Sequence, residues 1–173
     1  TGVQTCALPI SAVGGTVAFA STVTAAGFDL AIAGTEISIA ANVTGSGALT
    51  LKPSDTLTSM TIASGADTGA AILDLTTTEL AFIQSGFSSV TYGRNDSASG
   101  YTVTVNSTQL RAATSILTGG GTISGAGNIT GDVAGRGLTV SAGSGGIVNL
   151  SGTLGTAGTR LGAVSISAGG AST

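Results

Sequence analysis

The feature that most constrains the fold of this chain is a short pattern: Asn, an apolar residue, Thr or Ser, then Gly. It occurs at residues 42–45, 128–131 and 149–152, and a looser copy lies at 106–108. Successive steps between the last three copies are 22 and 21 residues. A period of about 20 to 25 residues, with one short strand and one turn per copy, predicts a solenoid. Equivalent residues of successive coils would then stack in ladders.

The composition favours a thin β-coil over a compact globule. The chain has 173 residues, of which 42% are hydrophobic but only 3% aromatic, and a globule usually needs more bulky side chains at its centre. Val, Ile, Leu and Ala suffice to fill a narrow bore. These apolar residues also argue against disorder, which the abundant Gly and Ser would otherwise allow.

Charge is sparse and excludes some classes of function. Charged residues make up 8% of the chain and the net charge is −3, against about 25% charged in ordinary soluble domains. The five basic residues are scattered, whereas nucleic acid needs clustered Lys and Arg. We therefore expect no nucleic-acid partner. The sequence contains no stretch of 18 apolar residues, so no membrane span is predicted. No signal peptide is recognisable.

Residues 1–10 are expected to be foreign to the fold. Their sequence, TGVQTCALPI, looks like the translation of a widely used DNA-sequencing adapter, so we expect it not to belong to the native fold. The alternative is a genuine strand that ends near Pro9. With the adapter interpretation, residues 11–173 form a single β-helix segment of a much longer protein, without cysteine.

Alternating apolar and polar residues predict strands with one buried face. Such segments lie at 16–20, 28–32, 36–39, 48–51, 89–92, 101–105, 138–140 and 164–166. Glycines separate them, including a turn expected at Ala33-Gly34, and Pro53 is expected to end a strand because it has no N–H for the ladder.

One segment has the pattern of a helix. Thr76 is followed three residues later by Glu79, which is a capping-box signature. Leu80 and Ile83 follow at helical spacing, so we expect one short helix at 77–84, leaning on the side of the rod.

About half of the chain resembles a known class of bacterial exoproteins. The segments that carry the resemblance are GALTLKP at 47–53, LDLT at 73–76, ELA at 79–81 and, most specifically, GFSSVTYGRND at 86–96. They are similar to repeats of filamentous-haemagglutinin-type proteins of two-partner secretion and of autotransporter-like adhesins. The glycine-rich segment 119–129 looks like autotransporter coils. The copy departs at Tyr92 and Asn95, where an aliphatic and a small residue are expected.

This resemblance implies a right-handed parallel β-helix, export across the outer membrane and a role in surface attachment. It implies a secreted or cell-surface location, the outer-membrane secretion machinery as a partner during export, and an unidentified host or surface receptor, with glycans as candidates. The secretion module and membrane anchor of such proteins are not part of this sequence.

We expect no enzyme and no cofactor. There is no His, so a Ser-His-Asp or His-metal site cannot form, and no two acids stand two residues apart. Asp67-Thr68-Gly69 matches the aspartic-protease tripeptide but has no second copy, and turn residues are the better interpretation. The glycine runs lack the Asp of calcium-binding β-rolls, so no metal is expected.

Two patterns admit a functional and a structural interpretation. Every Asn stands in Asn-x-Ser/Thr, which is either a glycan acceptor or a turn residue in a ladder. The ladder is the favoured interpretation for Asn42, Asn106, Asn128 and Asn149. Thr-x-Thr occurs at 22–24, 56–58 and 102–104. A flat array of such pairs can bind ice, but their spacing here favours ordinary solvent-facing strands.

The sequence thus predicts an all-β, right-handed parallel β-helix of seven or eight coils with one short helix. The predicted function is a structural passenger segment of a large bacterial adhesin, acting as a rod or a weakly specific adhesive surface. The alternatives are a fragment of a carbohydrate-active β-helix enzyme and an ice- or surface-binding face.

Overall fold

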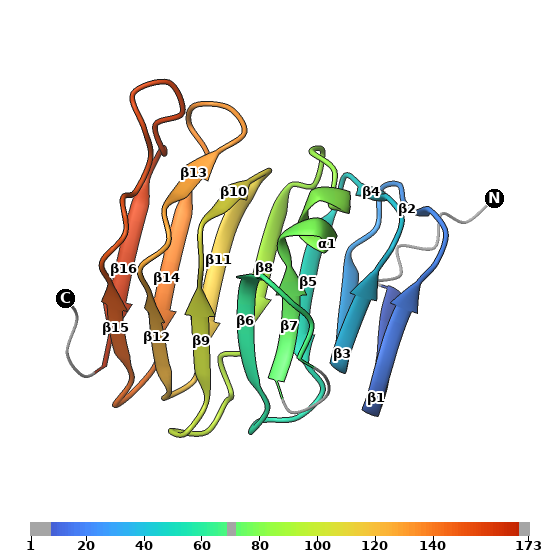
Figure 1. The fold of residues 1–173 in the computed structure, drawn as a ribbon, viewed down its shortest axis with the longest axis horizontal. Helices are drawn as coiled ribbons and strands as arrows, with labels where there is room; N and C mark the ends of the chain where they lie inside the picture. Colours follow the sequence, from blue (N-terminus) through green and yellow to red (C-terminus); the bar gives the residue numbers. More distant parts are fainter. Residues whose placement is uncertain (1–7, 69–71, 170–173) are drawn as a thin grey trace.

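The chain folds into a β-solenoid of about seven turns, with 54% of residues in strands and 4% in helix. The structure is a computed structural model that describes residues 8–68 and 72–169. Figure 1 shows the coils stacked side by side along one axis, from β1 to β16. The predicted fold class, a right-handed parallel β-helix with one short helix, is confirmed.

Two long sheets form the solenoid, and every described strand pair in them is parallel. The larger consists, in spatial order, of β1 (Leu8–Phe19), β3 (Leu30–Ile39), β5 (Ala48–Pro53), β8 (Ser89–Gly93), β11 (Ala113–Thr118), β14 (Leu138–Ala142) and β16 (Val164–Ala168). The smaller consists of β15 (Ile147–Leu150), β12 (Thr122–Gly125), β9 (Thr102–Val105), β6 (Ser59–Ser64) and β7 (Ile72–Thr76).

Two short pairs of strands form a third side of the coils. β2 (Val23–Ala25) pairs with β4 (Val43–Gly45), and β10 (Thr108–Leu110) pairs with β13 (Ile129–Gly131), both in parallel. Hydrogen bonds that link neighbouring coils join residues from 19 to 26 positions apart, except across the segment between β5 and β8, where Ser59 and Thr102 are 43 apart. The coil length expected from the asparagine spacing falls inside this range.

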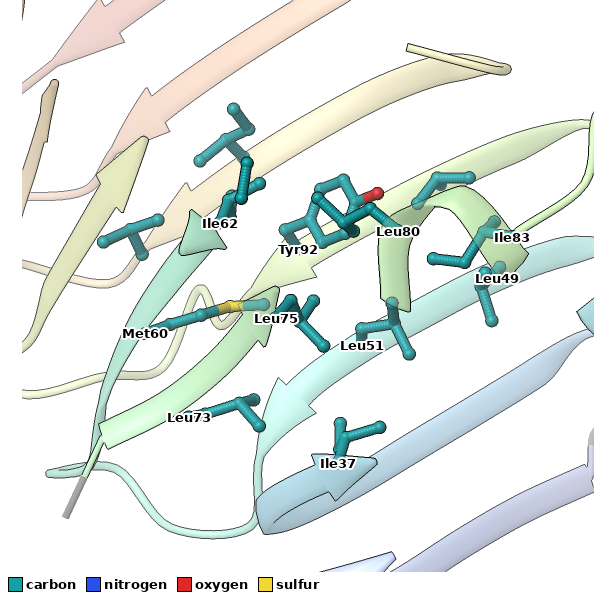
Figure 2. Packing of buried hydrophobic residues seen from close by; sticks show 14 of the residues in the cluster. Ile37, Leu49, Leu51, Met60, Ile62, Leu73, Leu75, Leu80, Ile83 and Tyr92 are labelled. Carbon is teal, nitrogen blue, oxygen red and sulfur yellow. The ribbon is translucent and has the colours of Figure 1, made fainter. Parts of the chain in front are cut away.

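Apolar ladders fill the bore. Residues paired in register along the seven-stranded sheet are Ile10, Ile32, Leu51, Tyr92, Ile116, Val140 and Ile166. Figure 2 shows members of this ladder packed against Met60, Ile62, Leu73 and Leu75 of the smaller sheet. Ile32, Leu51 and Met60 are at most 1% exposed. Full burial of such side chains contributes about 1.5–3 kcal/mol each, so the ladders are the main source of stability.

The third coil departs from the simple repeat. Sheet order places β7 on the far side of β6 from β9, so the chain turns back after β6 and lays β7 beside β3. Helix α1 (Thr77–Phe82) follows at once. The strand ladder then resumes, because β8 pairs with β5 across this whole excursion. The sequence pattern did not single out β7 or β11 as strands.

Helix α1 begins as expected and ends slightly earlier. Thr76 is the N-cap, and its side chain and that of Glu79 form the predicted capping box. The helix ends at Phe82, two residues before the expected end at Gln84, and Ile83 is its C-cap. Glu79 also accepts a hydrogen bond from the backbone N–H of Ile39 at 3.0 Å, which ties the helix to β3.

Two expectations on strand ends can be compared with the structure. Pro53 is the last residue of β5, as predicted. The turn expected at Ala33-Gly34 is wrong, because both residues lie inside β3, a ten-residue strand. Glycine is needed at position 34, because the Cβ of any other residue would lie only 2.4 Å from the carbonyl oxygen of Glu36.

The segment that resembles an adapter contributes to the first strand: Leu8, Pro9 and Ile10 pair with Leu30, Ala31 and Ile32. Among the described residues no helix is long and apolar enough to cross a membrane.

Glycines at the corners allow successive coils to approach closely. A Cβ on Gly121 would lie 1.8 Å from the carbonyl oxygen of Tyr101, and one on Gly143 would lie 1.9 Å from that of Gly119. These contacts involve backbone of the preceding coil, which cannot move without breaking the ladder.

We predict that Gly121→Ala destabilises the solenoid by about 1–3 kcal/mol, the usual cost of forcing extra atoms into a packed site. The matched control is Gly100→Ala, where an added Cβ would meet nothing within 4 Å. The control should be neutral or slightly stabilising because Ala restricts the unfolded chain. Urea unfolding followed by circular dichroism measures both, and equal stability of the two variants would contradict the close stacking.

Candidate functional site

A row of hydroxyl side chains runs along the outer face of the seven-stranded sheet. Its members, paired in register from β5 to β16, are Thr50, Thr91, Ser115, Thr139 and Ser165. Neighbouring hydroxyls in this hydroxyl row are spaced by one strand separation, about 4.8 Å. The row arises because side chains alternate along each strand, so these residues flank the buried ladder and face solvent.

The five-stranded sheet carries two shorter rows. Ser59, Thr102 and Thr122 lie in register. The hydroxyls of Ser59 and Thr102 form a hydrogen bond of 2.9 Å. Two residues further along each strand, Thr61, Thr104 and Ser124 form the parallel row.

The Thr-x-Thr pairs of the sequence do not share one side. Only Thr102 and Thr104 lie in this sheet, on β9. Thr24 lies in β2, where its hydroxyl accepts a hydrogen bond from that of Thr44 at 3.2 Å, and Thr56 precedes β6 in a loop. A flat array of the kind expected for ice binding is therefore not assembled from these pairs.

The four asparagines are all exposed but do not form one column. Thr108 of β10 pairs with Ile129 of β13, which places Ser107 opposite Asn128. The N–H of Asn128 donates to the Ser107 hydroxyl at 3.1 Å. Asn106 and Asn128 are thus offset by one residue. Asn149 lies in β15 and pairs with Ser124 on the other sheet.

Variable coil length explains the offset, since a fixed spacing stacks identical residues only if every coil is equally long. Asn128 is still a link between coils: its Oδ1 accepts from the Thr153 N–H at 2.9 Å. Asn42 Oδ1 likewise accepts from Gln84 Nε2 at 3.1 Å. The expected continuous asparagine ladder is therefore replaced by separate contacts. Glycosylation at these positions stays a prediction.

A hollow lies on the seven-stranded sheet where β5, β8 and β11 end, and we call it the Lys52 depression. Thr50 and Thr91 of the hydroxyl row and Leu117 line it, together with Gly93. Its volume is about 210 Å³. Gly93 has φ +87, and a Cβ there would lie 2.3 Å from the Leu117 carbonyl oxygen. Only glycine fits this position, because the Leu117 carbonyl oxygen occupies the space that a side chain would need.

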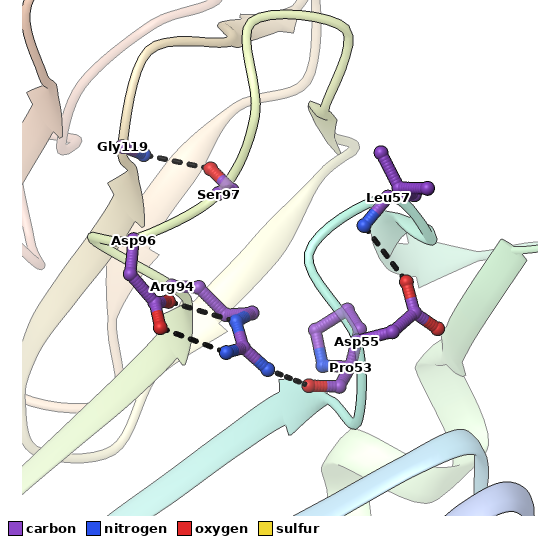
Figure 3. Close-up of polar contacts among 7 residues, drawn as sticks. All are labelled: Pro53, Asp55, Leu57, Arg94, Asp96, Ser97 and Gly119. Atoms are coloured by element: carbon purple, nitrogen blue, oxygen red, sulfur yellow. Dashed lines mark hydrogen bonds and ion pairs between the residues drawn. The ribbon is translucent and has the colours of Figure 1, made fainter.

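Charged and amide side chains form the rim of the Lys52 depression: Lys52, Arg94, Asn95 and Asp96. Arg94 donates from Nε and Nη2 to the two carboxylate oxygens of Asp96, each at 2.8 Å. Its Nη1 donates to the Pro53 carbonyl at 2.9 Å. Figure 3 shows how this guanidinium joins the loop after β5 to the loop after β8.

Several hydrogen bonds stiffen the two loops around Arg94. Asp55 accepts from the N–H groups of Leu57 and Thr58 at 2.7 and 2.6 Å, which lowers the pKa of Asp55. The Ser97 hydroxyl accepts from the Gly119 N–H at 2.7 Å. The guanidinium of Arg94 lowers the pKa of Asp96 in the same way. The rim is therefore held by backbone contacts, not by flexible side chains alone.

In the sequence, Lys52 and Arg94 are only two of the scattered basic residues. They lie 42 positions apart, and the pairing of β5 with β8 brings Lys52 beside Gly93. The sequence does contain a signal for this pairing, because GALTLKP at 47–53 and SSVTYGR at 88–94 have the same alternation of apolar and polar residues. Laying the two segments in register puts Lys52 next to the Gly93-Arg94 turn.

A second unusual group is the buried carboxyl of Glu36 in β3. The residue is 5% exposed, its Oε1 accepts from the Ile37 N–H at 2.9 Å, and its Oε2 has no hydrogen-bond partner in the described structure. Burial raises the pKa of Glu36 to about 7, and the nearby carboxylates of Asp67, Glu79 and Asp74 add to that shift.

The acids around Glu36 have partners of their own and do not form a metal centre. Asp74 accepts hydrogen bonds from the N–H and the hydroxyl of Thr68, the former at 3.0 Å. No group of three Asp, Glu, Cys or His side chains within residues 8–68 and 72–169 could hold a metal ion. In the Asp67-Thr68-Gly69 tripeptide, Gly69 lies outside the described residues.

Comparisons of the chain with protein-family models, with curated proteins and with solved structures gave no match. The solenoid, its hydroxyl rows and the Lys52 depression are therefore the features of the molecule that bear on its function.

We predict that stability falls as the pH rises from about 4.5 to about 7 because of Glu36. Its pKa is raised in the folded state, so between these values the folded chain binds a proton that the unfolded chain has lost. Asp55, Asp96 and Asp132 have lowered pKa values and titrate below this window.

The test is urea unfolding of the native chain and of Glu36→Gln at pH 5 and pH 8. The amide cannot ionise, so the variant should lose less stability between the two pH values and be the more stable protein at pH 8. Identical pH dependence in both proteins would show that Glu36 is not buried as described.

Proposed function

We propose that this chain is a rod segment of a large adhesin-type exoprotein and that its hydroxyl-rich faces provide weak, repeated attachment. The observation that carries the proposal is the hydroxyl row, which presents Thr50, Thr91, Ser115, Thr139 and Ser165 in register along the axis of the solenoid. A polysaccharide laid along the row could form one hydrogen bond after another with it.

Attachment of this kind becomes strong only when many weak contacts form at the same time. A single exposed hydrogen bond contributes only about 0.5–1.5 kcal/mol, but many copies on one surface convert later contacts into intramolecular ones. A rod that repeats the same face on every coil meets this requirement. In this proposal the receptor is a glycan or another hydroxyl-rich surface of a host or neighbouring cell.

The proposal places the protein outside the bacterial cell, either secreted or held at the surface, after export through outer-membrane secretion machinery. Two properties support this. Each coil contacts mainly its neighbours, so a solenoid can fold coil by coil as it emerges. The single Cys of the chain, Cys6, excludes an intrachain disulfide, so folding needs no oxidant.

Adhesion of coated beads tests the proposal. Beads carrying many copies of the chain should adhere to an immobilised neutral polysaccharide more strongly than albumin-coated beads under shear flow. The variant Ser115→Ala/Thr139→Val/Ser165→Ala removes three hydroxyls but keeps the shape of the strands, and should lower adhesion several-fold.

The matched control removes three exposed hydroxyls outside the row: Thr56→Val, Ser99→Ala and Ser151→Ala. It should adhere like the native chain. Adhesion no greater than that of albumin, or equal loss in both variants, would refute attachment through the hydroxyl row.

A further inference from the structure

We propose that the Lys52 depression binds one sugar unit that carries a single negative charge, either a carboxylate or a sulfate ester. This inference rests on the proposed function and deepens it, because it assigns a specific subsite within the otherwise weakly specific face. It starts from the charges of the rim.

Lys52 is the cation available for a ligand. Arg94 uses Nε, Nη1 and Nη2 in bonds to Asp96 and Pro53, and its side chain is 12% exposed. Asp96 is neutralised by this bidentate pair. The ammonium group of Lys52 makes no hydrogen bond or ion pair with the part of the chain that the structure describes. The residues that line the hollow, with Lys52 and Arg94 against Asp96, therefore carry one net positive charge on a chain of net charge −3.

Polar groups next to Lys52 suit the hydroxyls of a sugar ring. Thr50 and Thr91 place two hydroxyls on the floor, one strand apart, and Asn95 offers an exposed amide at the rim. The volume of about 210 Å³ is below the range of roughly 300–1,000 Å³ typical of pockets for drug-sized ligands. It suits one ring, with the remainder of a chain lying outside.

A buried hydroxyl lies beneath the floor and sets up a control on folding. Tyr101 is 0% exposed and its hydroxyl has no hydrogen-bond partner in the described structure. This oxygen lies 3.3 Å from the point where a Gly93 side chain would begin. An unsatisfied buried polar group costs about 1–3 kcal/mol, so this hydroxyl lowers the stability of the coil beneath the hollow.

The charge of the ligand follows from Lys52. A neutral sugar would satisfy the hydroxyls but would leave the ammonium group partly desolvated and unpaired. An anionic group on the same ring pairs with it, and charge-assisted hydrogen bonds are about twice as strong as neutral ones. Thr, Asn and Lys together therefore select an anionic sugar over a neutral one.

The single lysine of the chain allows a direct test. Reductive methylation with ¹³C-formaldehyde labels Lys52 and the N-terminal amine while keeping the positive charge, so the Lys52 methyl resonance reports on this site alone. Three matched sugars are titrated: galactose, galacturonate and galactose 6-sulfate. Galacturonate, galactose 6-sulfate or both should shift the Lys52 resonance with saturation, and galactose should bind at least about tenfold more weakly.

Variants separate binding from folding. Lys52→Met keeps the aliphatic stem and should weaken binding of the anionic sugar about tenfold or more, as judged by the shifts of backbone amides around Gly93. Arg160→Met, which removes an exposed cation at the other end of the solenoid, should leave binding unchanged. Tyr101→Phe removes the unpartnered buried hydroxyl, so it should unfold at the same or higher urea concentration and bind the anionic sugar like the native chain.

The inference is overturned if galactose binds as tightly as both anionic sugars, or if Lys52→Met binds like the native chain. Which anionic sugar binds more tightly identifies the source of the negative charge. The outcome is independent of the bead assay: loss of adhesion to neutral polysaccharide with intact binding of the anionic sugar refutes only the hydroxyl row. Adhesion without a Lys52 shift refutes only the subsite.

Discussion

The structure depends on one interaction, the parallel pairing of each coil with the coil before it, in register. No single coil contains enough apolar surface to form a core. Pairing provides the backbone hydrogen bonds and at the same time aligns the apolar side chains, so that Ile32, Leu51, Tyr92 and Ile116 form one ladder. The same alignment that buries these side chains places the neighbouring Thr and Ser in a row on the outside.

The sequence predicted the parts of the fold that repeat. Alternation in segments such as 48–51 and 89–92 identified strands, and Thr76 with Glu79 identified the start of the helix, because these signals are local. It did not predict that β7 lies on the far side of β6, since both strands have the same alternating pattern and nothing local encodes their order in space. The asparagine column was wrong for a related reason: coils differ in length, so equal spacing does not ensure stacking.

The sequence did not reveal the candidate site either, because local patterns do not encode which strands become neighbours. Lys52 and Arg94 are far apart in sequence and become neighbours only because β8 resumes the ladder on β5 after the excursion through β6, β7 and α1. In a chain with few charges, their convergence with Asp96 is notable, as is the burial of Glu36. Neither contributes to the ladder, and the unpaired Glu36 Oε2 and Tyr101 hydroxyl reduce stability. Buried polar groups that cost stability are candidates for function.

Disulfide trapping of engineered cysteines tests the register most directly, in a chain that also carries Cys6→Ser. Thr50 and Thr91 face each other on adjacent strands, where Cα atoms lie about 4.8 Å apart, within the range that a disulfide spans. Thr50 and Ser115 are separated by β8, about 10 Å apart and beyond that range. The account predicts rapid cross-linking of Thr50→Cys/Thr91→Cys and of Thr91→Cys/Ser115→Cys, and none of Thr50→Cys/Ser115→Cys. Cross-linking of the last pair as readily as the first would contradict the stacking of the coils.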